Sequence, residues 1–305
     1  MVIKSNTPPA VVPPTFTVGQ GEFIDFLKIK EMSMETIRGY EVDLNQFRQY
    51  LSKETNAPVF VDEITTEDLE EYQQSMQQRG LKPASINRKM NAVSSFFNYA
   101  VRKKWIGLNP AQYVERVKGK SAERCFLNAK EIQQIVEAME HPIIKHLVIM
   151  MANTGLRVSE CTNLTLHDVD FDEKVVRVIE GKGKKDRTVP MNDSLVQVMR
   201  AYLKKIRPKT NSLNFFATKK TGAISQQYVN RVLKQTCQKV GIQKDVTSHV
   251  LRHSFASQLV KTDTHVAIIQ RLLGHADVRT TSVYLHANQS DLKQAVNSIG
   301  FLDNE

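Results

Sequence analysis

The sequence predicts a mainly α-helical protein with a small β-sheet, arranged as a helical first domain and a mixed α+β second domain. Apolar residues recur at the three- to four-residue spacing of helices through most of the chain. Apolar–polar alternation, which is typical of strands, is confined to residues 166–191. A length of 305 residues and a hydrophobic content of 41 % suffice for two packed domains.

Composition and spacing also predict where the domains begin and end. Residues 1–16 are rich in proline and form a flexible arm, with no apolar stretch of signal-peptide length. Residues 17–110 form the helical domain, because no strand pattern interrupts them. Residues 111–125 form a linker, since the part from 118 to 124 is polar, basic and without periodicity. Residues 126–305 form the second domain.

The periodicity predicts about four helices in the first domain. An apolar stripe over residues 17–51 is interrupted near Ser33, which gives two helices. Thr65 can cap a third helix, which ends at Gly80. The fourth helix begins at Lys82. Its apolar face comprises Ile86, Met90, Val93, Phe97 and Val101.

The second domain begins with a helix that Asn128 can cap. An apolar helix follows and ends at Gly155, the usual C-cap residue, and a further helix starts directly after it. A basic β-hairpin comes next, because residues 175–179 alternate between two faces and Gly181–Gly183 marks a turn. Helical periodicity then resumes over two stretches, 194–206 and 226–240.

The charge of the chain is unevenly distributed. The formal net charge is +10, yet residues 1–117 are neutral, so residues 118–305 carry the whole excess. Within the first part, the segment from Tyr72 to Val114 contains no acid. Basic faces attract a polyanion and raise its encounter rate. Nucleic acid is therefore one predicted partner, and an ordinary solvated surface is the alternative.

Two further classes of protein are disfavoured. No apolar run approaches the roughly 18 residues of a membrane span, and no signal peptide is evident, so we expect a cytoplasmic protein without a membrane partner. The three cysteines, Cys125, Cys161 and Cys237, are far apart and odd in number, and they fit neither a disulfide framework nor a zinc spacing. We expect reduced thiols that pack as small hydrophobic residues.

The stretch HVLRHSFA, residues 249–256, places two histidines and an arginine within about one turn of a predicted helix. A helical zinc protease site would need glutamate directly after His249, and Arg252 would repel a metal cation. Ser254 lacks the glycine-flanked elbow of a hydrolase nucleophile. Phosphate is therefore the favoured ligand of this stretch.

Other segments supply further groups that can bind phosphate. Arg157 follows Gly155 at a helix start, where free N–H groups favour an anion. Lys182 lies in the hairpin turn, with Lys184 and Lys185 beside it. A tyrosine hydroxyl can attack phosphorus. Each residue alone also has an ordinary explanation, as a solvated arginine, a packed histidine or a basic turn. The candidate set is Arg157, Lys182, His249, Arg252, His275 and Tyr284.

Four segments together resemble the signature boxes of the tyrosine recombinase (phage integrase) family. In chain order they are TGLRVSE, GKGKKDRTVP, HVLRHSFAS and LLGHADVRTTSVYLH. They cover the second domain in the order of the family, which implies a mixed α+β catalytic domain. The helical first domain is similar to the family's SAM-like core-binding domain. Within the family, the chain resembles Xer-like and transposon- or plasmid-encoded recombinases.

The resemblance implies a role for each matching residue. Tyr284 would be the nucleophile, and Arg157 and Arg252 would clamp the scissile phosphate. His249 and His275 would donate hydrogen bonds to phosphate oxygens or assist proton transfer.

The remaining roles concern lysines and one acid. Lys182 would be the general acid for the leaving 5′-hydroxyl, although Lys184 is close enough to leave this choice open. Glu160 would brace the arginine box. The candidates for DNA binding are Lys82, Arg88, Lys89, Lys184 and Lys185.

The chemistry of the set fits this resemblance. A phenol has a pKa of about 10, so near pH 7 only about one tyrosine in a thousand is phenolate. A cluster of cations lowers the cost of the phenolate and stabilises charge on five-coordinate phosphorus. The resemblance implies a 3′-phosphotyrosyl intermediate and a Holliday junction, formed without ATP. The sequence has no Walker motif and no evident carboxylate cluster for magnesium, so we expect no cofactor and no metal.

The resemblance also implies partners. These are double-stranded DNA in the nucleoid and a homotetramer, or a heterotetramer with a paralogue, on two DNA sites. Residues 291–305 form a predicted amphipathic helix, which either packs on its own domain or docks in a neighbouring subunit. DNA relaxation of the type IB topoisomerase kind and DNA binding without catalysis are the alternatives. Integration, resolution of a mobile element or plasmid, and resolution of chromosome dimers all remain open, as does the target site.

Overall fold

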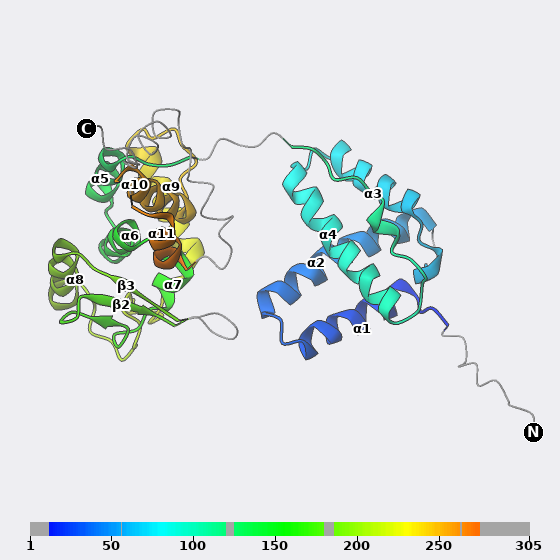
Figure 1. Ribbon diagram of the computed structural model, residues 1–305, viewed down its shortest axis with the longest axis horizontal. Coiled ribbons are helices and arrows are strands. Elements are labelled where there is room, and N and C mark those ends of the chain that lie inside the picture. The colour runs from blue at the N-terminus through cyan, green and yellow to red at the C-terminus, as the bar shows by residue number, and fades with distance from the viewer. Residues whose placement is uncertain (1–11, 56, 120–124, 180–185, 263, 275–305) are drawn as a thin grey trace, which may run out of the picture. The chain divides into compact units, whose positions relative to one another are not determined.

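The chain divides into two structural units, Met1–Ala122 and Glu123–Glu305. The computed structural model describes residues 12–55, 57–119, 125–179, 186–262 and 264–274 (Figure 1). Within these ranges no helix combines the length and the apolar character that crossing a membrane would require.

The first unit is a small helical domain. Its helices are α1 (Phe16–Ile29), α2 (Met34–Thr55), α3 (Thr66–Gln78) and α4 (Pro83–Arg102), with 3-10 turns at Val61–Glu63 and Pro110–Gln112. Helix α4 packs against each of the other three helices (Figure 1). Aromatic rings fill the space between them, and Phe47, Phe96 and Phe97 are completely buried. The prediction of about four helices is confirmed.

Local signals in the sequence set the ends of these helices. The Thr65 hydroxyl accepts a hydrogen bond from the backbone N–H of Asp68 at 3.2 Å, which caps α3. Gly80 follows α3 with a φ of 72°, a left-handed conformation that glycine adopts without steric cost. Ser33 lies at the predicted break and accepts a hydrogen bond from the backbone N–H of Thr36 at 3.2 Å.

One charged cluster in this unit departs from the sequence prediction. Lys89 is a sequence-predicted candidate for DNA binding, which requires exposure, but it is only 8 % exposed. Its ammonium group lies 3.2 Å from Oδ1 of Asp43, a residue of α2, and also donates to Gln46. Arg88 pairs with the same carboxylate, and its side chain remains 57 % exposed. The buried Asp43 attracts Lys89 inward, because an interior carboxylate needs positive partners. Lys89 is thus a structural residue.

This cluster carries a stability prediction. Replacing Asp43 with Asn leaves the Lys89 ammonium buried without its counter-charge, which is expected to lower the free energy of unfolding by about 3 kcal/mol. Trp105 is the chain's single tryptophan and is buried in this unit, so its fluorescence during urea unfolding reports on this unit. The control is Asp25→Asn, which removes an exposed pair with Lys28 and is expected to change little. Equal midpoints for the two variants would contradict the prediction.

The predicted linker begins as part of the first unit. Asn87 of α4 donates a hydrogen bond to the carbonyl of Val117 and accepts one from its backbone N–H, each at 3.0 Å. Gln73 of α3 donates to the carbonyl of Glu115 at 3.0 Å. The side chains of Ala111, Val114 and Val117 pack against the helical core. The segment is therefore fixed to α3 and α4 as far as Val117.

The second unit combines seven helices with a small sheet in its described residues. The helices are α5 (Ala129–Ala138), α6 (Pro142–Thr154), α7 (Val158–Asn163), α8 (Asp193–Lys205), α9 (Gln226–Lys239), α10 (Ser248–Lys261) and α11 (Val266–Leu273). The strands are β1 (Val169–Asp170), β2 (Val175–Val178) and β3 (Arg187–Pro190), antiparallel in the order β1-β2-β3. Helix α6 packs against α5, α7, α8 and α10, which explains why it is apolar nearly all round (Figure 1).

The sequence located the hairpin and missed two short elements. Val176 and Val178 are buried while Arg177 is exposed, as the alternation predicted. Val176 lies opposite Val169 on one side and Val189 on the other, so β1 is a third strand that we did not predict. Helix α11 was not predicted either. Strand β1 has two residues and α11 has eight, too few for a period to stand out.

The cysteines behave as small hydrophobic residues. Cys161 and Cys237 are buried free thiols, and Cys125 is half-buried and also free. Burial raises the pKa of Cys237 to about 11 and that of Cys161 well above its ordinary value. The expectation that the cysteines pack as small hydrophobic residues is confirmed.

Candidate active site around three arginines

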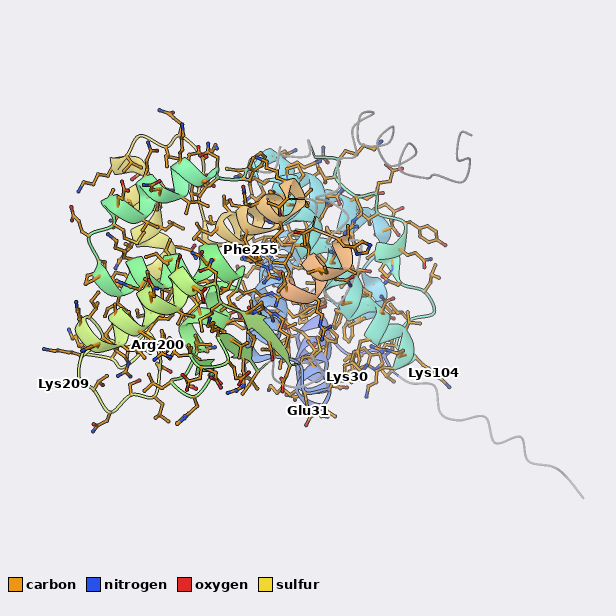
Figure 2. All side chains as sticks on the ribbon, turned by 60° about the vertical axis from the view of Figure 1, so that its left-hand side comes forward. Lys30, Glu31, Lys104, Arg200, Lys209 and Phe255 are labelled. Atoms are coloured by element: carbon orange, nitrogen blue, oxygen red, sulfur yellow. The ribbon has the colours of Figure 1, made fainter. Side chains whose placement is uncertain are left out.

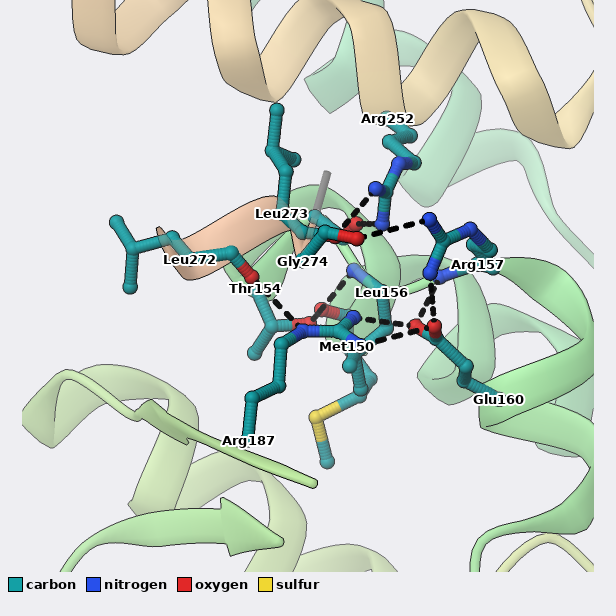
Figure 3. A network of polar contacts seen from close by, with 11 residues as sticks. Met150, Thr154, Leu156, Arg157, Glu160, Arg187, Arg252, Leu272, Leu273 and Gly274 are labelled. Carbon is teal, nitrogen blue, oxygen red and sulfur yellow. Dashed lines mark hydrogen bonds and ion pairs between the residues drawn. The ribbon is translucent and has the colours of Figure 1, made fainter. Parts of the chain in front are cut away.

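Three arginines from three different elements converge on the C-terminal end of α11 (Figure 3). Arg187 donates from Nε to the carbonyl of Leu272 at 3.1 Å. Arg252 donates to the carbonyl of Leu273, and Arg157 donates to that of Gly274 at 3.2 Å. The last carbonyls of a helix lack partners within the helix and carry its negative partial charge. The arginines therefore satisfy the end of α11 and are themselves held side by side.

Arg157 is placed by a sharp turn between α6 and α7. Gly155 ends α6 with a φ of 66°. A Cβ atom on Gly155 would lie 2.4 Å from the Phe255 ring of α10, a side chain labelled in Figure 2, so this position accepts only glycine. Two residues later, Arg157 is the N-cap of α7. The predicted position of Arg157 at a helix start is confirmed.

Glu160 joins two of the arginines. Its carboxylate accepts hydrogen bonds from the backbone N–H of Arg157 at 2.8 Å and from the guanidinium of Arg157 at 2.6 Å. Arg187 binds the same carboxylate through two nitrogens, at 2.6 and 3.1 Å. Burial disfavours the charged form of Glu160, but the hydrogen bonds and charges of Arg187 and Arg157 outweigh it and lower the pKa of the carboxyl to about 2. Glu160 is therefore ionised at any physiological pH.

Arg252 is the most deeply placed member of the sequence-predicted set that the structure describes. It lies on α10 and is 6 % exposed. Besides Leu273, it donates to the carbonyl of Gly155 at 2.8 Å, which connects α10 to the turn that carries Arg157. The three arginines and the single carboxylate of Glu160 leave a net positive charge at this place. A buried cluster of this kind can hold an anion with forked donors, as a phosphate requires.

Two other residues of the HVLRHSFA stretch differ in exposure: His249 is exposed and Ser254 is buried. His249 is exposed at the start of α10, three residues before Arg252, so both lie on neighbouring positions of the same helical face. Ser254 is buried; its hydroxyl donates to the carbonyl of Val250 and accepts from the backbone N–H of Leu127, each at 2.7 Å. Ser254 is thus engaged in packing, which agrees with the argument against a hydrolase nucleophile.

Several predicted residues lie outside the described part of the chain. They are Lys182, Lys184, Lys185, His275 and Tyr284. Their described chain neighbours include Gly274, directly before His275, and Arg187, two residues after Lys185. Among the DNA-binding candidates of the first unit, Lys82 is the N-cap of α4 and Arg88 is paired with Asp43. Within the described ranges no group of His, Cys, Asp and Glu side chains could hold a metal ion.

Arg187 is the residue that the sequence prediction missed. Its side chain is 7 % exposed and contacts both Glu160 and α11. One signal in the sequence could have drawn attention to it. The strand β3 places Arg187 opposite Val178, on the inward-facing side of the hairpin, and an arginine at an apolar position of a strand needs a buried partner.

Comparisons with known proteins agree with this architecture. The phage integrase family matches residues 125–291, and its N-terminal SAM-like domain matches residues 21–104. The tyrosine recombinase XerD of Staphylococcus epidermidis is 29 % identical over 286 residues, covering 90 % of this chain and 95 % of that protein. XerD of Staphylococcus saprophyticus is 28 % identical over 290 residues, covering 90 % and 96 %.

Solved structures show the same fold. The XerA recombinase is 28 % identical, with a TM-score of 0.52 and coverage of 94 % of this chain and 100 % of that one. The Tn1549 transposon integrase, solved with circular intermediate DNA, is 18 % identical with a TM-score of 0.77, covering 94 % and 99 %. A lambda integrase dimer bound to a COC′ core site is 19 % identical with a TM-score of 0.74, covering 96 % and 80 %.

Proposed function

Because this chain belongs to the phage integrase family and is a tyrosine-type site-specific DNA recombinase, we propose that it cuts and rejoins DNA through a 3′-phosphotyrosyl intermediate and a Holliday junction. The observation that carries the proposal is the set of three arginines gathered at the end of α11 (Figure 3). Arg157 and Arg252 of this set provide forked donors, and the end of α11 that they bind directly precedes His275 in the sequence.

In this proposal each residue of the site acts on one scissile phosphate. Arg157 and Arg252 bind its two non-bridging oxygens, since guanidinium groups suit bidentate recognition. His249 and His275 donate further hydrogen bonds or assist proton transfer. Glu160 holds the Arg157 side chain through the 2.6 Å pair described above.

The proposed reaction is an in-line displacement at phosphorus. The Tyr284 oxygen forms a bond to phosphorus and gives up its proton to His249 or His275, while the bond from phosphorus to the 5′-oxygen breaks. Lys182, or Lys184 in its place, supplies a proton to the leaving 5′-oxygen, which becomes a hydroxyl. Fixed positive charge stabilises both the phenolate and the five-coordinate phosphorus, because preorganised donors act where charge develops. The new ester retains most of the free energy of the phosphodiester, so neither ATP nor a metal ion is needed for rejoining.

DNA is the proposed substrate of both units. Several structures of similar fold are DNA complexes, including that of the Tn1549 integrase. Lys82 and Arg88 would contact the DNA backbone from the first unit, and Lys184 and Lys185 from the second. Lysine and arginine contacts to phosphates position a protein on DNA without selecting a base. The enzyme would act as a tetramer on two sites in the nucleoid, in the resolution or integration of a mobile element, plasmid or chromosome dimer.

A covalent-trapping assay tests the proposal. The full chain is incubated with nicked suicide duplexes and with fragmented genomic DNA from the organism that encodes it. Complexes that resist SDS are isolated, and the attached DNA is sequenced. Covalent complexes with the protein on a 3′-phosphate are expected. Tight DNA binding without any covalent complex would favour a silent DNA-binding protein, and plasmid relaxation without recombinants would favour a topoisomerase.

Deletion of residues 291–305 tests the proposed assembly. If this segment docks in a neighbouring subunit, its loss should abolish synapsis of two sites while a single site is still bound and cleaved. Native gel mobility of protein–DNA complexes separates one-site from two-site assemblies. Unchanged synapsis by the truncated chain would indicate that the segment packs on its own domain.

A further inference from the structure

We infer that Arg187 is a positioning residue of this recombinase: its guanidinium fixes the C-terminal end of α11 while it holds Glu160 against Arg157, which binds the scissile phosphate in the proposed function. The inference rests on the proposed function. In the inference, Arg187 acts through Glu160 and α11 and not on the scissile phosphate itself.

The Arg187 guanidinium donates hydrogen bonds to protein acceptors on both α7 and α11. Nη2 and Nη1 bind the two carboxylate oxygens of Glu160 at 2.6 and 3.1 Å, and Nε binds the Leu272 carbonyl at 3.1 Å. The side chain is 7 % exposed. A planar fork of this geometry fixes direction as well as charge. The position of α11 is therefore set relative to Glu160 by one rigid group.

Arg187 also contacts Gly274, the residue that ends α11. Gly274 ends α11 with a φ of 65°. A Cβ atom built on it would lie 2.9 Å from both Cδ and Nη1 of Arg187. Arg187 thus packs directly against the bare glycine backbone, so a larger side chain at residue 274 would press on the guanidinium. The left-handed turn and the guanidinium together hold Gly274, the residue directly before His275 in the sequence.

Arg187 also lies at the start of β3, opposite Val178 of β2. The segment with Lys182 lies between these strands in the sequence. One side chain therefore connects the hairpin, Glu160 of α7 and the end of α11. Each of these segments carries or braces a residue of the proposed site.

The alternative is that Arg187 contributes only positive charge toward DNA. Lysine separates the two explanations, because it keeps the charge and lacks the planar fork. Arg187→Lys and Arg187→Met are compared with the wild-type chain in single-turnover cleavage of a suicide duplex and in DNA affinity. Both variants are expected to cleave roughly a hundredfold more slowly, the effect of an ångström-scale displacement of reacting groups. Their affinity for DNA is expected to remain that of the wild type.

Arg177 provides the matched control. It lies on β2 of the same hairpin and also pairs with a carboxylate, Asp170 at 2.7 Å, but its side chain is 50 % exposed. Arg177→Lys and Arg177→Met should cleave at the wild-type rate. Arg187→Lys cleaving like the wild type would overturn the inference, as would a loss of DNA affinity equal to the loss of rate.

The pH profile gives a readout that loss of folding would not imitate. The charged groups that face Glu160 are the guanidiniums of Arg157 and Arg187, and the buried thiol of Cys161 lies beside it. With Arg187 present, the pKa of Glu160 lies at about 2. Without Arg187, burial is opposed by Arg157 alone and the pKa rises, so Glu160 becomes protonated as the pH falls. Cleavage by Arg187→Met should therefore decline at a higher pH on the acid side than cleavage by the wild type.

A second variant covers the case in which Arg187→Met does not fold. Gly274→Ala forces a Cβ atom against the Arg187 guanidinium and should slow cleavage without changing DNA affinity. In the double variant with Arg187→Lys, the reduction in cleavage rate should be smaller than the product of the two single reductions, because both substitutions act on one contact. Multiplicative effects would overturn the inference. If the wild-type chain itself forms no covalent complex, the proposed function fails. If the wild type cleaves and Arg187→Lys cleaves at the same rate, only the inference about Arg187 fails.

Discussion

Tyr284→Phe is expected to abolish covalent capture of DNA completely while leaving binding to the DNA site unchanged. The substitution removes only the oxygen that would form the bond to phosphorus, so the arginines at the end of α11 keep their places. The chain has eight tyrosines, and no other has the position of Tyr284, nine residues after the histidine of a Gly-His pair. Denaturing gels of suicide-substrate reactions measure the covalent product, and gel shifts measure binding.

The matched control for this variant is Tyr228→Phe. Tyr228 lies on α9 and its ring contacts His141 and Arg231, neither of which belongs to the arginine cluster. It should form covalent complexes at the wild-type level. Covalent trapping that survives in Tyr284→Phe would remove Tyr284 as the nucleophile. Loss of binding together with trapping would show that the hydroxyl supports the DNA complex itself.

Arg252→Lys is expected to give the second-largest effect, a loss of roughly a hundred- to a thousandfold in the rate of cleavage. This is the usual cost of removing one preorganised donor from a site where charge develops. Arg252 is 6 % exposed and its two terminal nitrogens are directed to carbonyls of two different segments, Gly155 and Leu273. A lysine ammonium cannot reproduce that planar geometry. Single-turnover cleavage at saturating protein measures the effect.

Arg207→Lys controls for the structural part of that loss. Arg207 also donates to backbone carbonyls, those of Ser212 at 2.6 Å and Asn214 at 2.9 Å, but in a loop away from α11. Both arginine variants should lower thermal stability, because each leaves a carbonyl without its donor. Only Arg252→Lys should lower the cleavage rate of the folded protein. Similar rates for the two variants would assign Arg252 to structure alone.

The sequence by itself determined the features that depend on near neighbours. Helix ends are one example: Thr65 and Asn128 accept hydrogen bonds from residues three positions later, so a short window contains the whole cap. The left-handed turn at Gly155 and the alternation of the β2 strand are equally local. The order of the four motif segments also indicated the family, which the match over residues 125–291 confirmed.

The tertiary structure decided which partners these residues meet. Arg157 and Gly274 are 117 positions apart, and Arg187 and Leu272 are 85 apart, so no period in the sequence relates them. Periodicity predicts that a face is buried, but it does not identify what lies opposite. Periodicity could not show that Lys89, a DNA-binding candidate, is buried, since its partner Asp43 lies on another helix. Arg187 was missed for the same reason. Its partners are the Glu160 carboxylate on α7 and the Leu272 carbonyl on α11, and only the folded chain brings both to the start of β3.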